Sequence, residues 1–148
     1  MDKQRIGFIG VGLMGHGIAK NIVGKGHPLT IRAHRNRVPV DDLLGRGAKE
    51  AKTYADVARA SDIVFLCVTG APQVEAAIGG ADGIIHAARA GLIVVDTSTS
   101  EPAVTARLRE QLAAKGVRLV DAPLARTPLE AEAGKLNIMV GADDATFA

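Results

Sequence analysis

Short runs of apolar residues without alternation recur along the chain, separated by stretches with helical spacing. The apolar runs are residues 6–9, 29–31, 63–68, 92–95, 117–120 and 136–140. A continuous run of this kind is typical of a strand that is covered on both faces of a sheet. Parallel neighbouring strands need a crossover connection, so strands that alternate with helices predict an α/β fold with a doubly wound, mainly parallel sheet and helices on both faces.

Capping signals predict two helix starts, one after Ser100 and one in the last eight residues of the sequence. Ser100-Glu101-Pro102 precedes Val104 and Leu108, and we expect the serine to cap this helix with the proline in its first turn. Residues 141–148 resemble a capped helix start. With 148 residues the chain is long enough for one compact domain. We interpret residues 1–148 as the front part of a longer protein.

A glycine-rich turn follows the first predicted strand. Gly10, Gly12 and Gly15 form G-x-G-x-x-G directly after residues 6–9 and open a helix that we expect to run to about Lys25. The first glycine permits the tight turn, the second lets a pyrophosphate approach the backbone, and the third lets helix pack on strand. This context predicts a Rossmann-type dinucleotide site, with the pyrophosphate at the helix N-terminus. The remaining residues of the turn expected at the cofactor are Val11, Leu13 and Met14.

The end of the second predicted strand carries a cluster of basic residues. A site for NAD usually has an acidic residue about 20 residues after the turn, yet none follows Gly15 before Asp41. The guanidinium group of an arginine can instead form two parallel hydrogen bonds to a 2′-phosphate, the group that distinguishes NADP from NAD. We therefore expect NADP as the cofactor, with NAD as the alternative. If the basic residues have no role in binding, they form a solvated basic loop. The residues expected at the 2′-phosphate are Arg32, Ala33, His34 and Arg35.

Four separated motifs carry a resemblance to a known family: the glycine turn at residues 7–15, Asp-Thr-Ser-Thr at 96–99, Asp-Ala-Pro-Leu at 121–124 and the segment 134–141. Together they resemble the β-hydroxyacid dehydrogenase family, which includes 3-hydroxyisobutyrate dehydrogenase, tartronate semialdehyde reductase and 6-phosphogluconate dehydrogenase. The resemblance spans essentially the whole chain in the right order. It implies an NAD(P)-dependent oxidoreductase that exchanges a hydride between the nicotinamide and a 3-hydroxy acid or its semialdehyde.

The resemblance also implies roles for residues at strand ends. Val68, Thr69 and Thr99 would lie along the cofactor, and Ser98 would lie near the nicotinamide and the substrate. Strand ends are where a doubly wound sheet binds its ligands. The alternative for the serine and threonine positions is simple helix capping.

The chain departs from the family's pattern at the substrate loop. Most members have Ser-Gly-Gly where this sequence has Ala125, Arg126 and Thr127. An arginine can grip a carboxylate in a bidentate, charge-assisted way, so we hypothesise that Arg126 and Thr127 rebuild the acid-binding site. The structural alternative is an arginine that points into solvent.

The family's general acid/base is a lysine on a long helix, and none of the seven lysines here lies in a matching motif. We therefore expect no catalytic residue in this chain. The helical C-terminal domain of the family, which closes over the substrate and usually forms the dimer, is also expected to lie outside it. Two alternatives stay open: an imine reductase, which replaces the lysine, and a non-catalytic relative that uses the fold for binding or oligomerisation.

Composition and charge limit the classes of partner that we expect for this protein. The net charge is +2 with dispersed basic residues and no nucleic-acid motif, and no apolar run approaches a membrane span. The single Cys67 lies in an apolar run, where we expect a small buried thiol in a reducing cytoplasm. The four histidines lack metal-ligand spacing, and we expect the first, His16, to be exposed. The expected partner is a small carboxylate substrate, and the full-length protein is expected to form a homo-oligomer.

Overall fold

Six parallel strands form the central sheet. A computed structural model describes residues 2–32, 35–125 and 127–148. Within these residues the strand order is β3-β2-β1-β4-β5-β6, with every neighbouring pair parallel. The predicted Rossmann-type fold is confirmed. The strands are β1 (Ile6–Ile9), β2 (Leu29–Arg32), β3 (Lys49–Ala51), β4 (Ile63–Leu66), β5 (Ile93–Asp96) and β6 (Arg118–Asp121).

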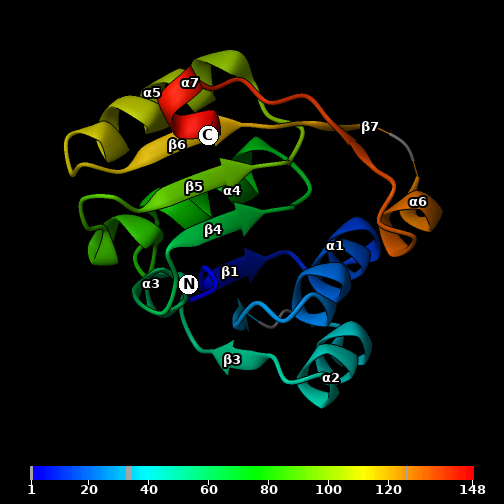
Figure 1. The fold of residues 1–148 in the computed structure, drawn as a ribbon. Coiled ribbons are helices and arrows are strands. Elements are labelled where there is room, and N and C mark those ends of the chain that lie inside the picture. Colours follow the sequence, from blue (N-terminus) through cyan, green and yellow to red (C-terminus); the bar gives the residue numbers. More distant parts are fainter. Residues whose placement is uncertain (1, 33–34, 126) are drawn as a thin grey trace.

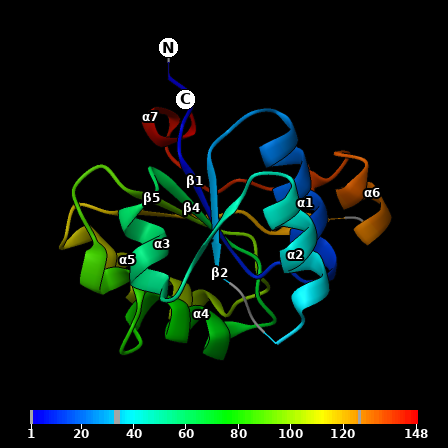
Figure 2. The ribbon, with the colours of Figure 1, turned by 90° about the horizontal axis from the view of Figure 1, so that it is seen from below.

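Helices cover both faces of the sheet, as Figures 1 and 2 show. One face carries α1 (Leu13–Gly24), α2 (Arg37–Gly45) and the short α6 (Pro128–Glu132). The other carries α3 (Tyr54–Arg59), α4 (Ala71–Gly79), α5 (Pro102–Ala113) and the 3₁₀ turn η1 (Ile84–Ala87). The strand order reverses at β1, which pairs with β2 and β4, so the crevice for a ligand opens beyond its carboxyl end.

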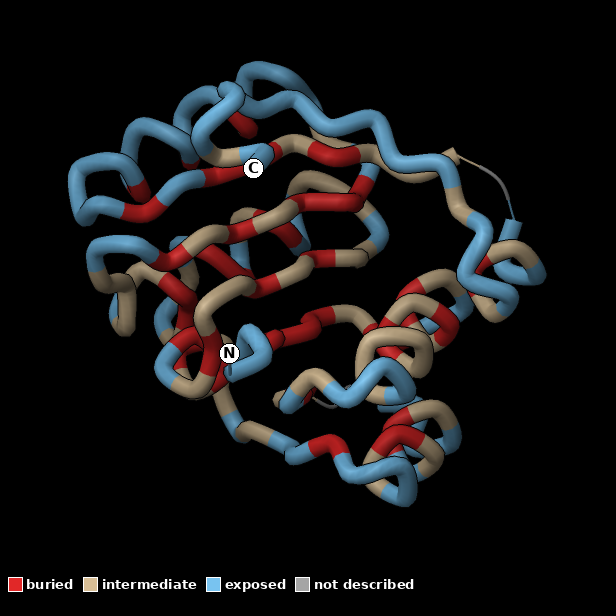
Figure 3. Tube along the Cα trace, viewed as in Figure 1, coloured by how far each residue is buried: buried red, intermediate tan, exposed pale blue. Residues whose placement is uncertain are grey.

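The core consists of two clusters, one on each side of the sheet. Phe8 and Ile31 pack with Leu43 of α2, whereas Ile9 and Leu66 pack with the helices of the opposite face. Consecutive strand residues therefore enter different clusters, which explains apolar runs without alternation. Figure 3 shows the buried strands and the exposed outer helix faces. Among the described helices, none combines the length and the apolarity needed to cross a membrane.

Two strand predictions from the sequence are wrong. Strand β3 was not predicted, because Lys49 and Glu50 are charged and exposed on an edge strand that pairs only with β2 in the described sheet. Residues 136–140 were predicted as a strand of the main sheet. Only Asn137 and Ile138 form a strand, β8, and this strand pairs antiparallel with β7 (Leu124–Ala125) in a separate ribbon. This apolar run is exposed rather than covered, since Met139 retains 60% of its accessible surface.

The predicted serine cap is also wrong. Helix α5 begins at Pro102 as expected, but its N-cap is Glu101 and no side chain caps it. The Ser100 hydroxyl is buried without a hydrogen-bond partner among the described residues. The helix start in residues 141–148 is confirmed, because the Asp143 carboxylate accepts a hydrogen bond from Thr146 N at 2.8 Å and caps α7 (Asp144–Phe147).

Helix α6 is fastened closely to α1. A Cβ atom at Gly17 would lie 2.6 Å from Glu132 N, so only a glycine lets the two backbones approach to this distance. Asn21 on α1 then donates from Nδ2 to Ala131 O at 3.0 Å and to Glu132 O at 3.2 Å. These bonds tie carbonyls at the end of α6 to α1, in addition to the backbone hydrogen bond that Ala131 O accepts from Gly134 N.

Candidate cofactor site

The glycine turn has the geometry that a dinucleotide cradle requires. Gly10 has φ +99°, and a Cβ there would lie 2.1 Å from the Cys67 carbonyl oxygen. A Cβ at Gly15 would lie 1.8 Å from the Gly10 carbonyl oxygen, so the start of α1 packs directly on the turn. A Cβ at Gly12 would meet nothing within 4 Å. The turn is therefore closed where the backbone packs and open where the pyrophosphate is expected.

The N-terminus of α1 faces this open space. Gly12 is its N-cap and supplies no side chain to bind the first-turn N–H groups. Unpaired N–H groups and the helix dipole attract an anion at such an end. Leu13 is 84% exposed here, and Met14 is half-buried. The residues of the turn thus fit a bound pyrophosphate.

A cavity of about 270 Å³ extends from the turn across the carboxyl ends of β1, β2 and β4. It brings together six residues that the sequence analysis expected: Gly10, Val11, Gly12, Arg32, Val68 and Thr69. It also contains Tyr54 and Gln73 from α3 and α4, which sequence reasoning missed because only the fold brings these helices to β1. Asn36 and Cys67 line it too. Burial raises the pKa of the Cys67 thiol, as expected for a half-buried free cysteine.

Arg32 occupies the position at the end of β2 where an acidic residue is usual in an NAD site. Its Cζ lies 3.9 Å from the centre of the Tyr54 ring, and its guanidinium lies 3.6 Å from the Asp82 carboxylate. The Nε atom is buried without a hydrogen-bond partner among the described residues. Such an orphaned donor beside the cavity fits a polar or anionic ligand group.

The rest of the basic cluster divides into residues with different partners. Arg35 is exposed and makes no ion pair with other described residues. Arg37 is bound to Glu50 at 2.8 Å and to Asp41 at 3.1 Å, so its guanidinium is already paired. Ala33 and His34 lie outside the described residues.

The end of β5 forms a network of short polar contacts beside Val68. Ser98 is buried, and its Oγ accepts a hydrogen bond from Val68 N at 2.9 Å. Ser98 N in turn donates to Asp96 Oδ1 at 2.9 Å. Burial raises the pKa of Asp96, which is 1% exposed. These bonds join the ends of β4 and β5, while Thr99 is exposed beside them.

In the described part of the substrate loop, the hydroxyl of Thr127 is bound within its own helix start. Ala125 is half-buried in β7 and has no polar group, and Arg126 lies outside the described residues. The Thr127 hydroxyl donates to the Glu130 carboxylate, and Thr127 N donates to the same oxygen at 3.0 Å. Thr127 therefore starts α6 with a capping box and does not present a free hydroxyl in this arrangement.

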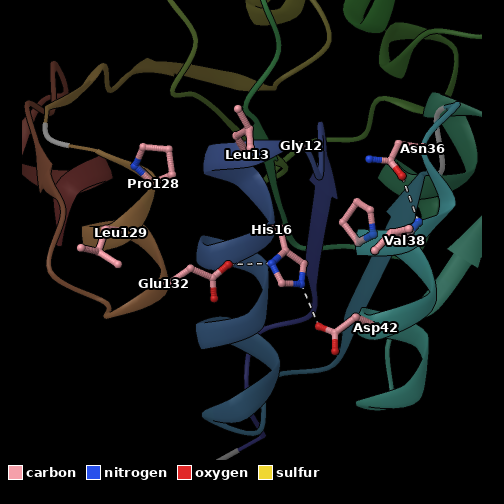
Figure 4. Close-up of a pocket in the computed structure, with 10 residues that line it drawn as sticks. Gly12, Leu13, His16, Asn36, Val38, Asp42, Pro128, Leu129 and Glu132 are labelled. Atoms are coloured by element: carbon pink, nitrogen blue, oxygen red, sulfur yellow. Dashed lines mark hydrogen bonds and ion pairs between the residues drawn. The ribbon is translucent and has the colours of Figure 1, made fainter.

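A second, larger groove of about 780 Å³ adjoins the cavity and shares Gly12, Asn36 and Pro39 with it. Figure 4 shows that α1, α2 and α6 form its walls. His16 lies at its floor between Asp42 and Glu132. The expectation that His16 is exposed is wrong, because packing of α6 on α1 encloses it, and its side chain retains only 21% of its accessible surface.

A family model for the NAD binding domain of 6-phosphogluconate dehydrogenase matches residues 5–148. The match includes the glycine turn, the basic cluster and the substrate loop. The chain belongs to this family. Membership confirms the resemblance to the β-hydroxyacid dehydrogenases and identifies the chain as an NAD(P)-binding domain of that type.

Individual relatives agree with the family assignment. The chain is 38% identical to 2-(hydroxymethyl)glutarate dehydrogenase of Eubacterium barkeri over 99% of its length and 49% of the relative's. It is 39% identical to 2-hydroxy-3-oxopropionate reductase of Escherichia coli K12 over 97% of its length and 49% of the relative's. The solved structure of Psf3 in complex with NADP⁺ and 2-OPP superposes with a TM-score of 0.88 at 29% identity, covering 96% of this chain and 50% of that one. The chain thus spans about half the length of the curated relatives it matches.

Proposed function

We propose that this NAD(P)-binding domain serves an oxidoreductase that exchanges a hydride between NADP(H) and a 3-hydroxy acid or its semialdehyde. The relatives named as a hydroxyacid dehydrogenase and an oxopropionate reductase support this reaction class. The nicotinamide, when bound, supplies or accepts the hydride. The residues of this chain bind the dinucleotide at Gly12, orient it along Val68 and Thr69, and hold its nicotinamide end beside Ser98 and Thr99.

The observation that carries the preference for NADP is Arg32. It combines a place at the end of β2, a stacked guanidinium over Tyr54 and a buried Nε without a partner among the described residues. Arg35 adds a second guanidinium that is free to move toward a 2′-phosphate, and a carboxylate that would bind the ribose 2′-hydroxyl of NAD is missing from the end of β2. The structure of Psf3 with NADP⁺ supports the same choice.

Dissociation constants for NADPH and NADH, measured by titration of the chain, test the preference. We expect NADPH to bind at least tenfold more tightly than NADH. Arg35→Ala and Arg32→Ala should each weaken NADPH binding by about tenfold, since a charge-assisted hydrogen bond contributes about 1.5–3 kcal/mol. NADH binding to Arg35→Ala should change little.

Arg107→Ala is the matched control, because Arg107 is exposed on α5 and pairs with Glu75 away from the cavity. Tighter binding of NADH than of NADPH by the unmodified chain would contradict the preference for NADP.

We further propose that the acid/base residue and a helical domain that closes over the substrate follow residue 148 in the full-length protein. The share of each relative that this chain covers supports that arrangement. In this proposal the full-length protein is a homo-oligomer in the cytoplasm, and Arg126 binds the carboxylate of the substrate.

One observation favours a second candidate. Neither Ala125 nor the hydroxyl of Thr127, which is bound to Glu130, supplies a free donor to a substrate acid group. An imine reductase, or a relative that binds a dinucleotide without catalysis, needs no such donor. Assays of the full-length protein with NADPH and either a semialdehyde or a cyclic imine separate these candidates. Turnover of the semialdehyde supports the dehydrogenase, and turnover of the imine alone rejects it.

A further inference from the structure

His16 connects three helices at the floor of the second groove. On α1, it lies one turn after the start of the helix. Its Nδ1 lies 2.7 Å from Glu132 Oε1 on α6, and its Nε2 lies 2.7 Å from Asp42 Oδ2 on α2. Figure 4 shows the ring between the two carboxylates.

The chemistry of these contacts depends on the protonation of the ring. A carboxylate can only accept hydrogen bonds, and a neutral imidazole has one N–H donor. Both contacts can be hydrogen bonds at the same time only when both ring nitrogens carry a proton. The imidazolium form therefore joins α2 and α6 through α1, whereas the neutral form must release one of them.

The groups around the ring keep both carboxylates charged. Arg46 on α2 donates to Asp42 at 2.9 Å, and Lys20 on α1 donates to Glu132. The Arg46 hydrogen bond, followed by that of His16, lowers the pKa of Asp42. The Lys20 hydrogen bond, followed by that of His16, lowers the pKa of Glu132. Protonation of the ring therefore decides whether both contacts to these charged carboxylates are hydrogen bonds.

The two helices held by His16 are the ones that follow the proposed ligand-binding loops. Helix α2 starts at Asn36, which accepts from Val38 N at 3.1 Å and lines both the cofactor cavity and the groove. Helix α6 starts at Thr127, at the end of the proposed substrate loop. Helix α6 has further hydrogen bonds to α1 through Asn21 and Lys20, whereas α2 is joined to α1 by the His16–Asp42 contact alone among the side-chain hydrogen bonds of the described residues.

We propose that His16 is a positioning residue that, as an imidazolium, holds α2 in place beside the phosphate-binding turn and so couples the affinity for NADP(H) to protonation. This inference rests on the proposed function, because it concerns binding at the same cofactor site. Deprotonation of His16 releases the bond to Asp42 or to Glu132. Release of Asp42 leaves Asn36 less fixed against the dinucleotide.

The test compares NADPH dissociation constants of wild type and His16→Gln between about pH 5.5 and pH 8.5, the range in which an imidazole titrates. Glutamine has no proton to lose in this range. We expect the variant to bind about fivefold more weakly at low pH and equally to wild type at high pH. The ratio of the two constants is the measurement, because titration of the 2′-phosphate is common to both proteins and cancels.

NMR of the His16 ring nitrogens, recorded on the chain without cofactor, gives an independent readout. We expect both nitrogens to be protonated at low pH and the loss of one proton over the interval in which the affinity ratio changes. Asp42→Asn should lower NADPH affinity at low pH as His16→Gln does, and Glu132→Gln should do so less. His27→Gln is the matched control, because His27 is remote from the groove and its ring contacts Gln4 O.

Circular dichroism establishes that each variant is folded, and Asp42→Asn tests the proposal if His16→Gln does not fold. A ratio that stays constant with pH, while wild type binds NADPH, overturns the coupling alone. A wild-type chain that does not bind NADPH overturns the proposed function and the coupling with it, whereas the NMR data still report whether the ring bridges both carboxylates.

Discussion

Two glycines of the same turn have opposite structural constraints. Gly10 has a positive φ and its missing Cβ faces a backbone carbonyl, so any side chain there disturbs the chain itself. Gly12 has open space around it and φ −83°, which other residues adopt readily. We therefore expect Gly10 to be required for folding and Gly12 only for the proposed ligand, a division that the sequence motif alone does not reveal.

Replacement of Gly12 by alanine should separate these roles. We expect Gly12→Ala to leave the free energy of unfolding within about 0.5 kcal/mol of wild type, the usual range for surface changes. Affinity for NADPH should fall more than about tenfold, because the methyl group enters the space of the pyrophosphate. Thermal unfolding and NADPH titration measure the two quantities.

Gly24→Ala is the control, since Gly24 ends the same helix and also has nothing within 4 Å of its Cβ. Gly10→Ala should instead be strongly destabilised. Unchanged NADPH affinity in Gly12→Ala would place the pyrophosphate elsewhere.

At the scale of elements, hydrogen bonds at helix starts determine which polar side chains contribute to stability. Thr53 Oγ1 accepts from Asp56 N at 3.0 Å and caps α3. Ser100, which the sequence suggested as the cap of α5, makes no such bond among the described residues. The hydroxyl groups of these two residues therefore contribute differently to stability.

Removal of the two hydroxyl groups should show the difference. We expect Thr53→Ala to lower the free energy of unfolding by about 1 kcal/mol, the usual contribution of an N-cap. Ser100→Ala should not lower it, because the alanine removes a buried hydroxyl without a partner. Urea denaturation measures both, and Thr53→Ser should restore most of the loss. A larger cost for Ser100→Ala than for Thr53→Ala would show that the sequence assignment of the cap was right.

The elements that sequence predicted correctly share strong local signals. The strands at residues 6–9 and 63–66 are apolar throughout, and the glycine turn has fixed spacing. Predictions from the local sequence pattern were wrong where contacts between distant residues determine the structure. Lys49 and Glu50 are in a strand only because β2 provides an edge, and the apolar residues near Met139 are exposed because the chain leaves the sheet after β6.

The site was predictable to the same extent. Gly12 follows β1 directly and Arg32 ends β2, so the positions of both residues beside the cavity could be predicted from their spacing in the sequence. Tyr54 and the partners of His16 could not, because 116 residues separate His16 from Glu132 and no local pattern pairs them. The partner of Thr127 is only three residues away, and the spacing Thr-x-x-Glu is the local signal that could have predicted its capping box.

At the scale of the whole molecule, paired carboxylates determine how stability depends on pH. Hydrogen bonds from arginine, lysine or backbone N–H groups lower the pKa of five of them in the folded chain: Asp42, Glu50, Asp62, Glu132 and Asp143. A group whose pKa is lower in the folded than in the unfolded state adds stability above its unfolded value, near pH 4. That contribution is lost as the pH falls through the folded value.

We therefore expect the thermal midpoint to fall steadily as the pH is lowered from about 5 to about 3. Asp96 acts in the opposite direction, because burial raises its pKa and protonation relieves the cost of its buried charge. Asp62→Asn, which removes the pair with Arg5, should reduce the acid sensitivity. Calorimetry between these pH values measures the effect, and a midpoint that rises toward pH 3 would contradict it.

The attachment of α6 to α1 also has a consequence for synthesis on the ribosome. Asn21 and its partner Ala131 are 110 residues apart, and Gly17 faces the same late segment. At about 5–20 residues per second, the face of α1 around Gly17 stays uncovered for roughly 5–20 seconds after the helix itself has been made. A nascent chain halted before Pro128 should therefore expose this face to chaperones, while the first strands and helices already fold behind it.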